Sequence, residues 1–283
     1  MRYSIKLSYC GAPFSGWQIQ KGAPSVQETL EKALSTLLGE EISVTGAGRT
    51  DTGVNAVGYV AHFDTESHAA VGGADFCYKI NAILPSSVRV HEIIPAKPDF
   101  HARFDAISRE YTYFLHRKKD PFAESFSLYY GYPALDFDAM NEAAQLLLGT
   151  HDFNCFEKTG GNNKTSICTV TEARWVKYVP THVSLLGYPE DGYWYFRISA
   201  NRFLRNMVRA VVGSLLELGR GRRDLPWFAS LIYDAPRPTD ASPNDASPDA
   251  LPRSDAGSAN RLTRSDAGES VPGHALFLSR IDY

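Results

Sequence analysis

The glycine-rich segment GAGRTDTG, at residues 46–53, presents a carboxylate that could do chemistry. Asp51 lies two residues after Arg49, and a neighbouring cation favours the ionised form of a carboxylate. The segment is not a dinucleotide-binding fingerprint, because GxGxxG would require glycine at position 51. An aspartic protease is a distant alternative, since such enzymes share one proton between two carboxylates and this chain has a single DTG triplet. A structural turn, in which Asp51 caps its own backbone, is the simplest alternative.

A second chemical signal is a basic window from Arg197 to Arg223, which holds seven basic residues and one acidic residue. Within residues 201–223, apolar residues recur at helical spacing from Phe203 to Leu215, which predicts a helix with a core face and a basic face, and residues 219–223 extend the positive surface past the end of this helix. Guanidinium groups on one face fit phosphate oxygens, so this face is a candidate RNA-binding surface, and a solvated helix face is the alternative. The arginines expected on or beside this surface are Arg202, Arg205, Arg209, Arg220 and Arg222.

The overall charge alone suggests a different partner. The chain has 283 residues, of which 43% are hydrophobic, and a net charge of −3. Nucleic-acid binders are usually basic, so this average argues against RNA. However, residues 234–283 hold 5 basic and 8 acidic residues, and this tail supplies the negative charge. Within it, residues 234–264 are rich in alanine, serine, aspartate and proline, which predicts a mobile low-complexity insertion.

Cysteine spacing and apolar runs bear on metals and membranes. The four cysteines, Cys10, Cys77, Cys155 and Cys168, lie far apart and form no CxxC pair or zinc-ligand spacing. No run reaches the roughly 18 apolar residues that a membrane-spanning helix requires. We therefore expect a cytoplasmic protein without a metal site or membrane contact.

The elements that must position these residues follow from periodicity and helix caps. Alternating apolar and polar residues predict strands over 3–9, 57–63, 88–94, 109–117 and 193–199. Ser25 and Glu28 match a capping box at the start of a helix that ends at Gly39. A second helix begins after Asp136 and ends at Gly149. Because no long parallel βαβ rhythm is present, we predict an α+β fold with a mixed, mainly antiparallel sheet and helices on one side.

The string GAGRTDTGVNAVGYVAHF, at residues 46–63, resembles the signature turn of the tRNA pseudouridine synthase A family. Other blocks resemble the family in the same order, namely NAILP (81–85), FHARFDAISREYTYFL (100–115), GTHDFNCF (149–156), FLRNMVR (203–209) and VPGHALFLSRIDY (271–283). The sequence departs from the family at Asn55, where the family usually has histidine, and in the insertion at 234–264.

This resemblance implies a fold, a reaction and partners. It implies the pseudouridine synthase fold, in which two RRM-like (ferredoxin-like) halves, residues 1–108 and 109–283, share one sheet with the active cleft between them. It implies an isomerase that converts uridines 38, 39 and 40 in the anticodon stem-loop of tRNAs to pseudouridine without a cofactor. Family members act as homodimers, so tRNA and a second copy of the chain are the expected partners.

The resemblance also implies roles for single residues. Asp51 matches the catalytic nucleophile, and Arg49 would hold it ionised and oriented. Tyr111 matches the active-site tyrosine, which would stack on the target base and could take part in a proton transfer. Leu276 would pack against the flipped uracil, and the arginines of the basic window would bind the RNA backbone. A catalytically inactive RNA-binding paralogue is the alternative, and the joint presence of Arg49, Asp51 and Tyr111 favours the enzyme.

Overall fold

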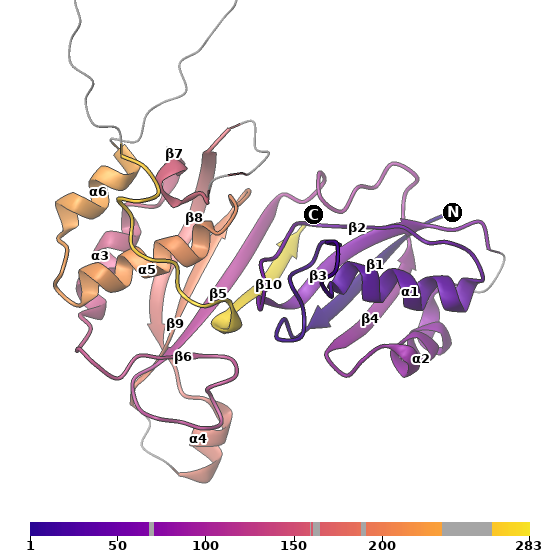
Figure 1. Cartoon of the computed structure of the whole chain (residues 1–283), viewed down its shortest axis with the longest axis horizontal. Helices are drawn as coiled ribbons and strands as arrows, with labels where there is room; N and C mark the ends of the chain where they lie inside the picture. The colour runs from indigo at the N-terminus through magenta and orange to yellow at the C-terminus, as the bar shows by residue number, and fades with distance from the viewer. Residues whose placement is uncertain (68–70, 159, 161–164, 188–190, 234–261) are drawn as a thin grey trace, which may run out of the picture.

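A computed structural model describes residues 1–67, 71–158, 160, 165–187, 191–233 and 262–283. Its strands are β1 (Arg2–Tyr9), β2 (Val44–Gly46), β3 (Asn55–Asp64), β4 (Val88–Pro95), β5 (Ser108–His116), β6 (Leu128–Tyr129), β7 (Gly149–Asp152), β8 (Ile167–Lys177), β9 (Tyr193–Ala200) and β10 (Leu276–Asp282). Within the described residues they form one ten-stranded sheet with the order β4-β1-β3-β10-β5-β9-β8-β7, with β2 beside β3 and β6 beside β5 (Figure 1). Only β10–β3 and β5–β6 pair in parallel among these described strands, which confirms the predicted α+β class with a mixed, mainly antiparallel sheet.

Two groups of helices build two cores on the sheet (Figure 1). The helices are α1 (Val26–Leu38), α2 (Gly73–Ile83), α3 (Phe137–Gln145), α4 (Thr181–Leu186), α5 (Met207–Gly219) and α6 (Leu225–Tyr233), with short 3₁₀ turns η1 (Asn154–Phe156) and η2 (Gly273–Ala275). Helices α1 and α2 form a first core with β1, β3 and β4, and α3, α5 and α6 form a second core with β5, β8 and β9. None of the helices in the described part of the chain combines the length and apolar character of a membrane span.

Strand β10 lies at the seam between the two cores. It pairs in parallel with β3 and antiparallel with β5, although its residues come from the end of the chain. Leu276 belongs to the second core and Leu278 to the first. Because residues two apart on a strand share one face, both cores lie on the same face of the sheet. The division at residue 108 stays a prediction.

Local signals placed the first helix correctly and misplaced the end of another. The Ser25 side chain accepts the backbone N–H of Glu28 (3.2 Å), and Gly39 closes α1 in a left-handed conformation, as predicted. Asp136 caps α3 as predicted, but α3 ends at Gln145 rather than at Gly149. Gly149 instead begins β7, because its backbone pairs with β8 in the sheet.

The basic helix predicted within 201–223 begins later in the structure than the apolar periodicity predicts. Helix α5 begins at Met207, because Asn206 adopts a left-handed backbone (φ 64°) that cannot continue a right-handed helix. The helix ends at Gly219, and nearly all of its residues are buried. The prediction of a single helix with one basic face is therefore wrong.

Of the five arginines predicted on or beside the basic surface, Arg209 alone lies within α5. Arg202 and Arg205 precede the helix, whereas Arg220 and Arg222 follow it. Residues 268–271 run along α5 and help to bury it, since the Gly268 N–H donates to the Ser214 hydroxyl (2.9 Å) and the Val271 N–H donates to the Arg209 carbonyl (3.2 Å). A helix that is covered on most sides leaves no room for a solvent-exposed basic face.

The insertion predicted over 234–264 is only partly within the structure. Residues 234–261 lie outside the described residues. Leu262 packs against the second core, and the guanidinium of Arg264 donates to the Ser270 hydroxyl (2.6 Å). The end of the predicted insertion is thus part of the packed body.

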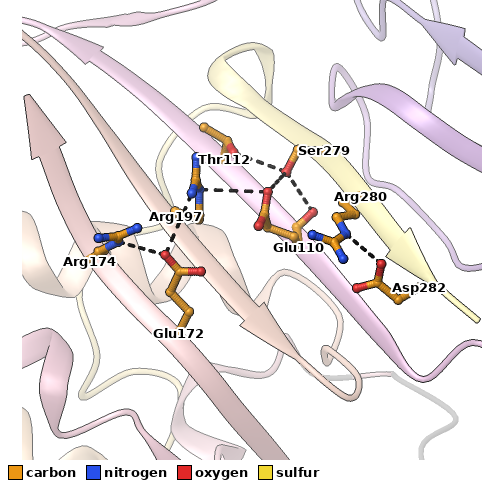
Figure 2. Close-up of polar contacts among 8 residues, drawn as sticks. All are labelled: Glu110, Thr112, Glu172, Arg174, Arg197, Ser279, Arg280 and Asp282. Atoms are coloured by element: carbon orange, nitrogen blue, oxygen red, sulfur yellow. Dashed lines mark hydrogen bonds and ion pairs between the residues drawn. The ribbon is translucent and has the colours of Figure 1, made fainter. Parts of the chain in front are cut away.

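The sheet face opposite the two cores carries a ladder of charged side chains (Figure 2). Arg197 on β9 lies 3.9 Å from a carboxylate oxygen of Glu110 on β5 and 3.9 Å from one of Glu172 on β8. Glu172 also accepts from Arg174 (2.7 Å), and Glu110 accepts from the Ser279 hydroxyl on β10 (2.9 Å). The ladder therefore joins four neighbouring strands and pairs each arginine with a carboxylate.

Candidate active site

The turn that carries Asp51 is held rigidly between β2 and β3. The Trp17 N–H donates to the Thr50 carbonyl (3.2 Å), and the Tyr9 hydroxyl bonds the Thr50 side chain (2.8 Å). The Val54 N–H closes the turn on the Asp51 carbonyl (3.1 Å). These bonds fix the backbone on both sides of Asp51, so its carboxylate is presented from a preorganised turn.

Two glycines outside the predicted site allow the chain to approach this turn. Gly16 has φ 103°, and a Cβ there would lie 2.4 Å from the Thr50 carbonyl oxygen. A Cβ on Gly11 would lie 2.2 Å from the Val54 carbonyl oxygen. Any side chain at either position would therefore push the turn out of place. The sequence shows that both residues are glycines, but it does not show that they approach the turn with Asp51.

A cavity of about 1080 Å³ lies over the seam between the two cores. Seven of the predicted site residues line it together, namely Arg49, Asp51, Tyr111, Arg202, Arg205, Arg209 and Leu276. Arg220 and Arg222 do not line this cavity. Arg220 instead pairs with Glu217 one turn earlier on α5, which removes it from the predicted basic surface.

The ion pair of Asp51 is with Arg209 rather than with Arg49. Arg209 Nη1 lies 3.6 Å from Asp51 Oδ2, and the exposed fractions of the two side chains are 22% and 32%. Arg209 is itself positioned, because its Nε donates to the Val271 carbonyl (2.7 Å). Arg49 is exposed at the cavity and forms no ion pair with Asp51 within the described chain. The partner of Asp51 thus comes from the second core.

Tyr111 and Leu276 form part of the cavity wall supplied by the sheet. The Tyr111 ring packs edge-on against Phe203, with ring centroids 5.1 Å apart and an interplanar angle of 88°. Burial raises the pKa of Tyr111 well above its usual range, and the negative charge of Asp51 raises it further. Tyr111 is therefore a neutral phenol at physiological pH, which suits stacking or hydrogen-bond donation rather than action as a base.

Asn55, where the sequence departs from the family pattern, links the turn to the terminal segment. Its side-chain oxygen accepts the Gly11 N–H (2.8 Å), and its amide nitrogen donates to the His274 carbonyl (2.7 Å). Asn55 is buried, and both of these contacts are made in the same orientation of the amide. The asparagine thereby joins β3 to the segment that leads into Leu276.

Arg109 is a cavity residue that the sequence did not single out. Its guanidinium donates to four backbone carbonyls, those of Ala47 (3.1 Å), Arg103 (2.6 Å), Ala106 (3.0 Å) and Asn201 (2.9 Å). Burial lowers the pKa of Arg109 from its ordinary value. Arg109 thus connects the Asp51 turn, the β4–β5 loop and the loop after β9. No local pattern signals the full set of acceptors, because Ala47 and Asn201 come from segments distant in the sequence.

Comparison with known proteins places this geometry in a family. The family model described as tRNA pseudouridine synthase matches residues 143–257. A protein of Porphyromonas gingivalis, named tRNA pseudouridine synthase A, is 42% identical over 282 residues that cover 100% of this chain and 97% of the relative. A protein of that name from Parabacteroides distasonis is 41% identical, covering 100% of this chain and 96% of the relative.

A third relative shows the same similarity over a shorter range. The tRNA pseudouridine synthase A of Chlorobaculum tepidum is 40% identical over 244 residues, which cover 86% of this chain and 92% of the relative. The matches to the Porphyromonas and Parabacteroides proteins span this whole chain, and so include the turn with Asp51 as well as the range of the family model. The chain belongs to the tRNA pseudouridine synthase A family of isomerases.

Proposed function

We propose that the chain isomerises uridine to pseudouridine in tRNA, with Asp51 as the nucleophile. The N1–C1′ bond of the nucleotide breaks, the uracil turns, and a C5–C1′ bond forms. The proton on C5 is lost and N1 gains one, so the product is an isomer of the substrate. A single carboxylate that forms and then breaks a covalent bond is sufficient for this exchange.

The observation that carries the proposal is the position of Asp51. Its side chain is one-third exposed in a large cavity, on a rigid turn, with the Arg209 guanidinium 3.6 Å away. A cation at this distance attracts the carboxylate in its anionic, nucleophilic form. Tyr111, as a neutral phenol, stacks on the uracil and can donate a hydrogen bond, while Leu276 packs against the turned base.

We further propose that the substrate uridines are 38, 39 and 40 of the anticodon stem-loop, and that the enzyme acts in the cytoplasm as a homodimer. These proposals are supported by the resemblance of the motif blocks to the family. A base in a stem must leave the stack, at a cost of roughly a few kcal/mol. Arg202 and Arg205 line the cavity without an ion pair in the described part of the chain, and are available to phosphates that offset this cost.

The test is conversion of an unmodified tRNA transcript, detected by carbodiimide treatment and primer extension. Wild-type protein is expected to convert uridines 38 to 40, and Asp51→Asn to lower the single-turnover rate by about 10⁴-fold or more. Asp51→Asn should still bind the tRNA, because the amide keeps the size of the side chain.

Asp138→Asn on α3 is the matched control, since Asp138 is exposed and lies outside the cavity. It should convert tRNA at the wild-type rate. Wild-type protein that binds tRNA but converts no uridine would support the inactive paralogue instead. Retained activity in Asp51→Asn would remove Asp51 from the nucleophilic role, and light scattering of the purified protein would test the homodimer.

A further inference from the structure

The loop between β4 and β5 presents an exposed aromatic ring at the cavity. Phe104 lines the same cavity as Asp51, yet its side chain is 74% exposed. The two other aromatic residues of the lining, Tyr111 and Phe203, are partly buried and pack against one another. Among the aromatic residues of this lining, Phe104 therefore presents its ring most openly to a ligand.

The exposure of Phe104 is not a sign of a loose loop. The Ala102 N–H donates to His62 Nδ1 on β3 (3.1 Å), and the Ala102 carbonyl accepts from the Tyr283 hydroxyl (2.7 Å). The Arg103 carbonyl is one of the four acceptors of Arg109. The loop is thus fixed to β3, β5 and the end of the chain. A ligand that binds Phe104 would meet an ordered surface and would lose less entropy on binding.

The neighbours of Phe104 have the chemistry that a nucleobase requires. The His101 ring lies 4.1 Å from the Phe104 ring, with an interplanar angle of 32°. The Arg103 guanidinium lies 5.8 Å from the same ring. Aromatic rings and arginine planes together form stacking surfaces for unpaired bases.

Two arginines that could bind RNA phosphates lie next to this surface. Arg103 and Arg49 both line the main cavity and a smaller adjoining hollow of about 170 Å³, which Trp17 and Gln18 also line. Within the described residues neither arginine forms an ion pair. Two unpaired cations around a small hollow, beside an exposed ring, match the alternation of base and phosphate in an RNA strand.

The main cavity is large enough to hold more than the target uridine. Pockets that enclose a whole drug-sized ligand measure about 300–1,000 Å³. A cavity of about 1080 Å³ therefore exceeds what one uracil and its ribose need. Its lining places Phe104 in the same enclosure as the carboxylate of Asp51.

We propose that Phe104, with His101 and Arg103, forms a second base subsite that stacks an unpaired nucleobase flanking the target uridine. This inference rests on the proposed function and adds a specificity element to the same site. An unpaired neighbouring base fits here, because within a continuous stem both faces of a paired base are covered by its stacked neighbours. The subsite therefore favours targets next to a loop or a disrupted pair.

A double-mutant cycle tests the stacking. Stem-loop RNAs, each with one abasic nucleotide near the target uridine, are titrated against Asp51→Asn protein with and without Phe104→Leu. Phe104→Leu should weaken binding of the intact RNA about tenfold. For Asp51→Asn protein that retains Phe104, removal of the base at one of the tested positions should weaken binding by a similar factor. At that position the two losses should not add, because each change removes the same contact.

Phe122→Leu is the matched control, since Phe122 is 75% exposed and lies outside the cavity. It should bind every RNA like its parent. Unchanged affinity of Phe104→Leu, or losses that add at every abasic position, would overturn the subsite. If the RNA-free Phe104→Leu protein differs from its parent in oligomeric state, as measured by light scattering, Phe104 forms a protein contact. That result would overturn the subsite as well. Wild-type conversion of tRNA is scored separately, so failure of the subsite and failure of the proposed function are distinguishable.

Discussion

On one face of β5, Tyr111 lines the cavity beside Asp51 and Arg209, and on the other face Glu110 pairs with Arg197 (Figure 2). The same strand thus separates two charged regions. On the cavity face, Arg202 and Arg205 form no ion pair among the described residues. On the ladder face, arginines and glutamates neutralise one another across four strands.

The comparison shows why a count of charges along the chain is a poor guide to a binding surface. Arg197 and Arg209 belong to the same basic window, but they lie on opposite faces of the sheet. Arg220 is also neutralised, by Glu217. The positive field at the cavity therefore depends on the arginines that the fold leaves unpaired, together with the one beside Asp51.

The largest effect is a difference in the single-turnover rate between Arg209→Gln and Arg197→Gln. Loss of the cation beside Asp51 should lower the single-turnover rate by about 10³-fold, the effect of removing one electrostatic contact at a reacting centre. Arg197→Gln should leave the rate within about twofold, because its partners lie on the far face. Single-turnover conversion of tRNA measures both, and equal losses in the two variants would break the distinction between the faces.

A smaller effect is expected on the pH dependence of stability. It arises from His62, whose bond to Ala102 holds the β4–β5 loop. Burial, with the nearby positive charge of Arg2, lowers the pKa of His62 to about 4. The unfolded chain takes up this proton near pH 6.5, whereas the folded chain does so only near pH 4. Stability from this group is therefore complete above pH 6.5 and is lost as the pH falls toward 4, by about 3 kcal/mol.

Urea unfolding at pH 7 and pH 4.5 measures this loss. His62→Gln keeps an acceptor for the Ala102 N–H but does not titrate, so its stability should change less between the two pH values. His91→Gln is the control, because the pKa of His91 is also lowered but His91 lies at an exposed position on β4 and bonds the Ser8 hydroxyl rather than the β4–β5 loop; this variant should keep most of the wild-type pH dependence. A pH dependence in His62→Gln equal to that of the wild type would contradict the assignment.

The smallest effect concerns the salt dependence of tRNA binding. Arg205→Ala should flatten the slope of log K against log salt by about 0.7 to 0.9, the contribution of one phosphate contact. Arg220→Ala should leave the slope unchanged, because this arginine is paired with Glu217 and lies outside the cavity. Titrations between about 50 and 200 mM salt are sufficient. Equal slopes in both variants would return Arg205 to the role of a solvated side chain.

The sequence was informative where the signal is local. The cap of α1 at Ser25 lies within three residues of its partner Glu28, and the alternation over 109–117 predicted the strand β5 that carries Tyr111. The turn with Asp51 was found from its motif. The α+β class followed from the order of such local elements.

What the sequence did not reveal depends on distant segments or on one backbone angle. The helical periodicity continues through Asn206, so only its left-handed φ shows that α5 starts after it. The pairing of Asp51 with Arg209 joins residues from two cores, and nothing near Arg49 indicates it. The position of Arg197 could have been predicted. Arg197 follows Phe196 on β9, and side chains alternate along a strand, so Arg197 lies on the face opposite that of Phe196.

The position of β10 has a consequence for protein synthesis. Leu276 and Leu278 come from the last strand of the chain, yet they line the cavity between β3 and β5. The ribosome must therefore have synthesised β10, long after Asp51, before the pocket around Asp51 can close. Nascent chains that lack β10 have the carboxylate but not the enclosure, so the tRNA-modifying site cannot assemble until β10 has been made.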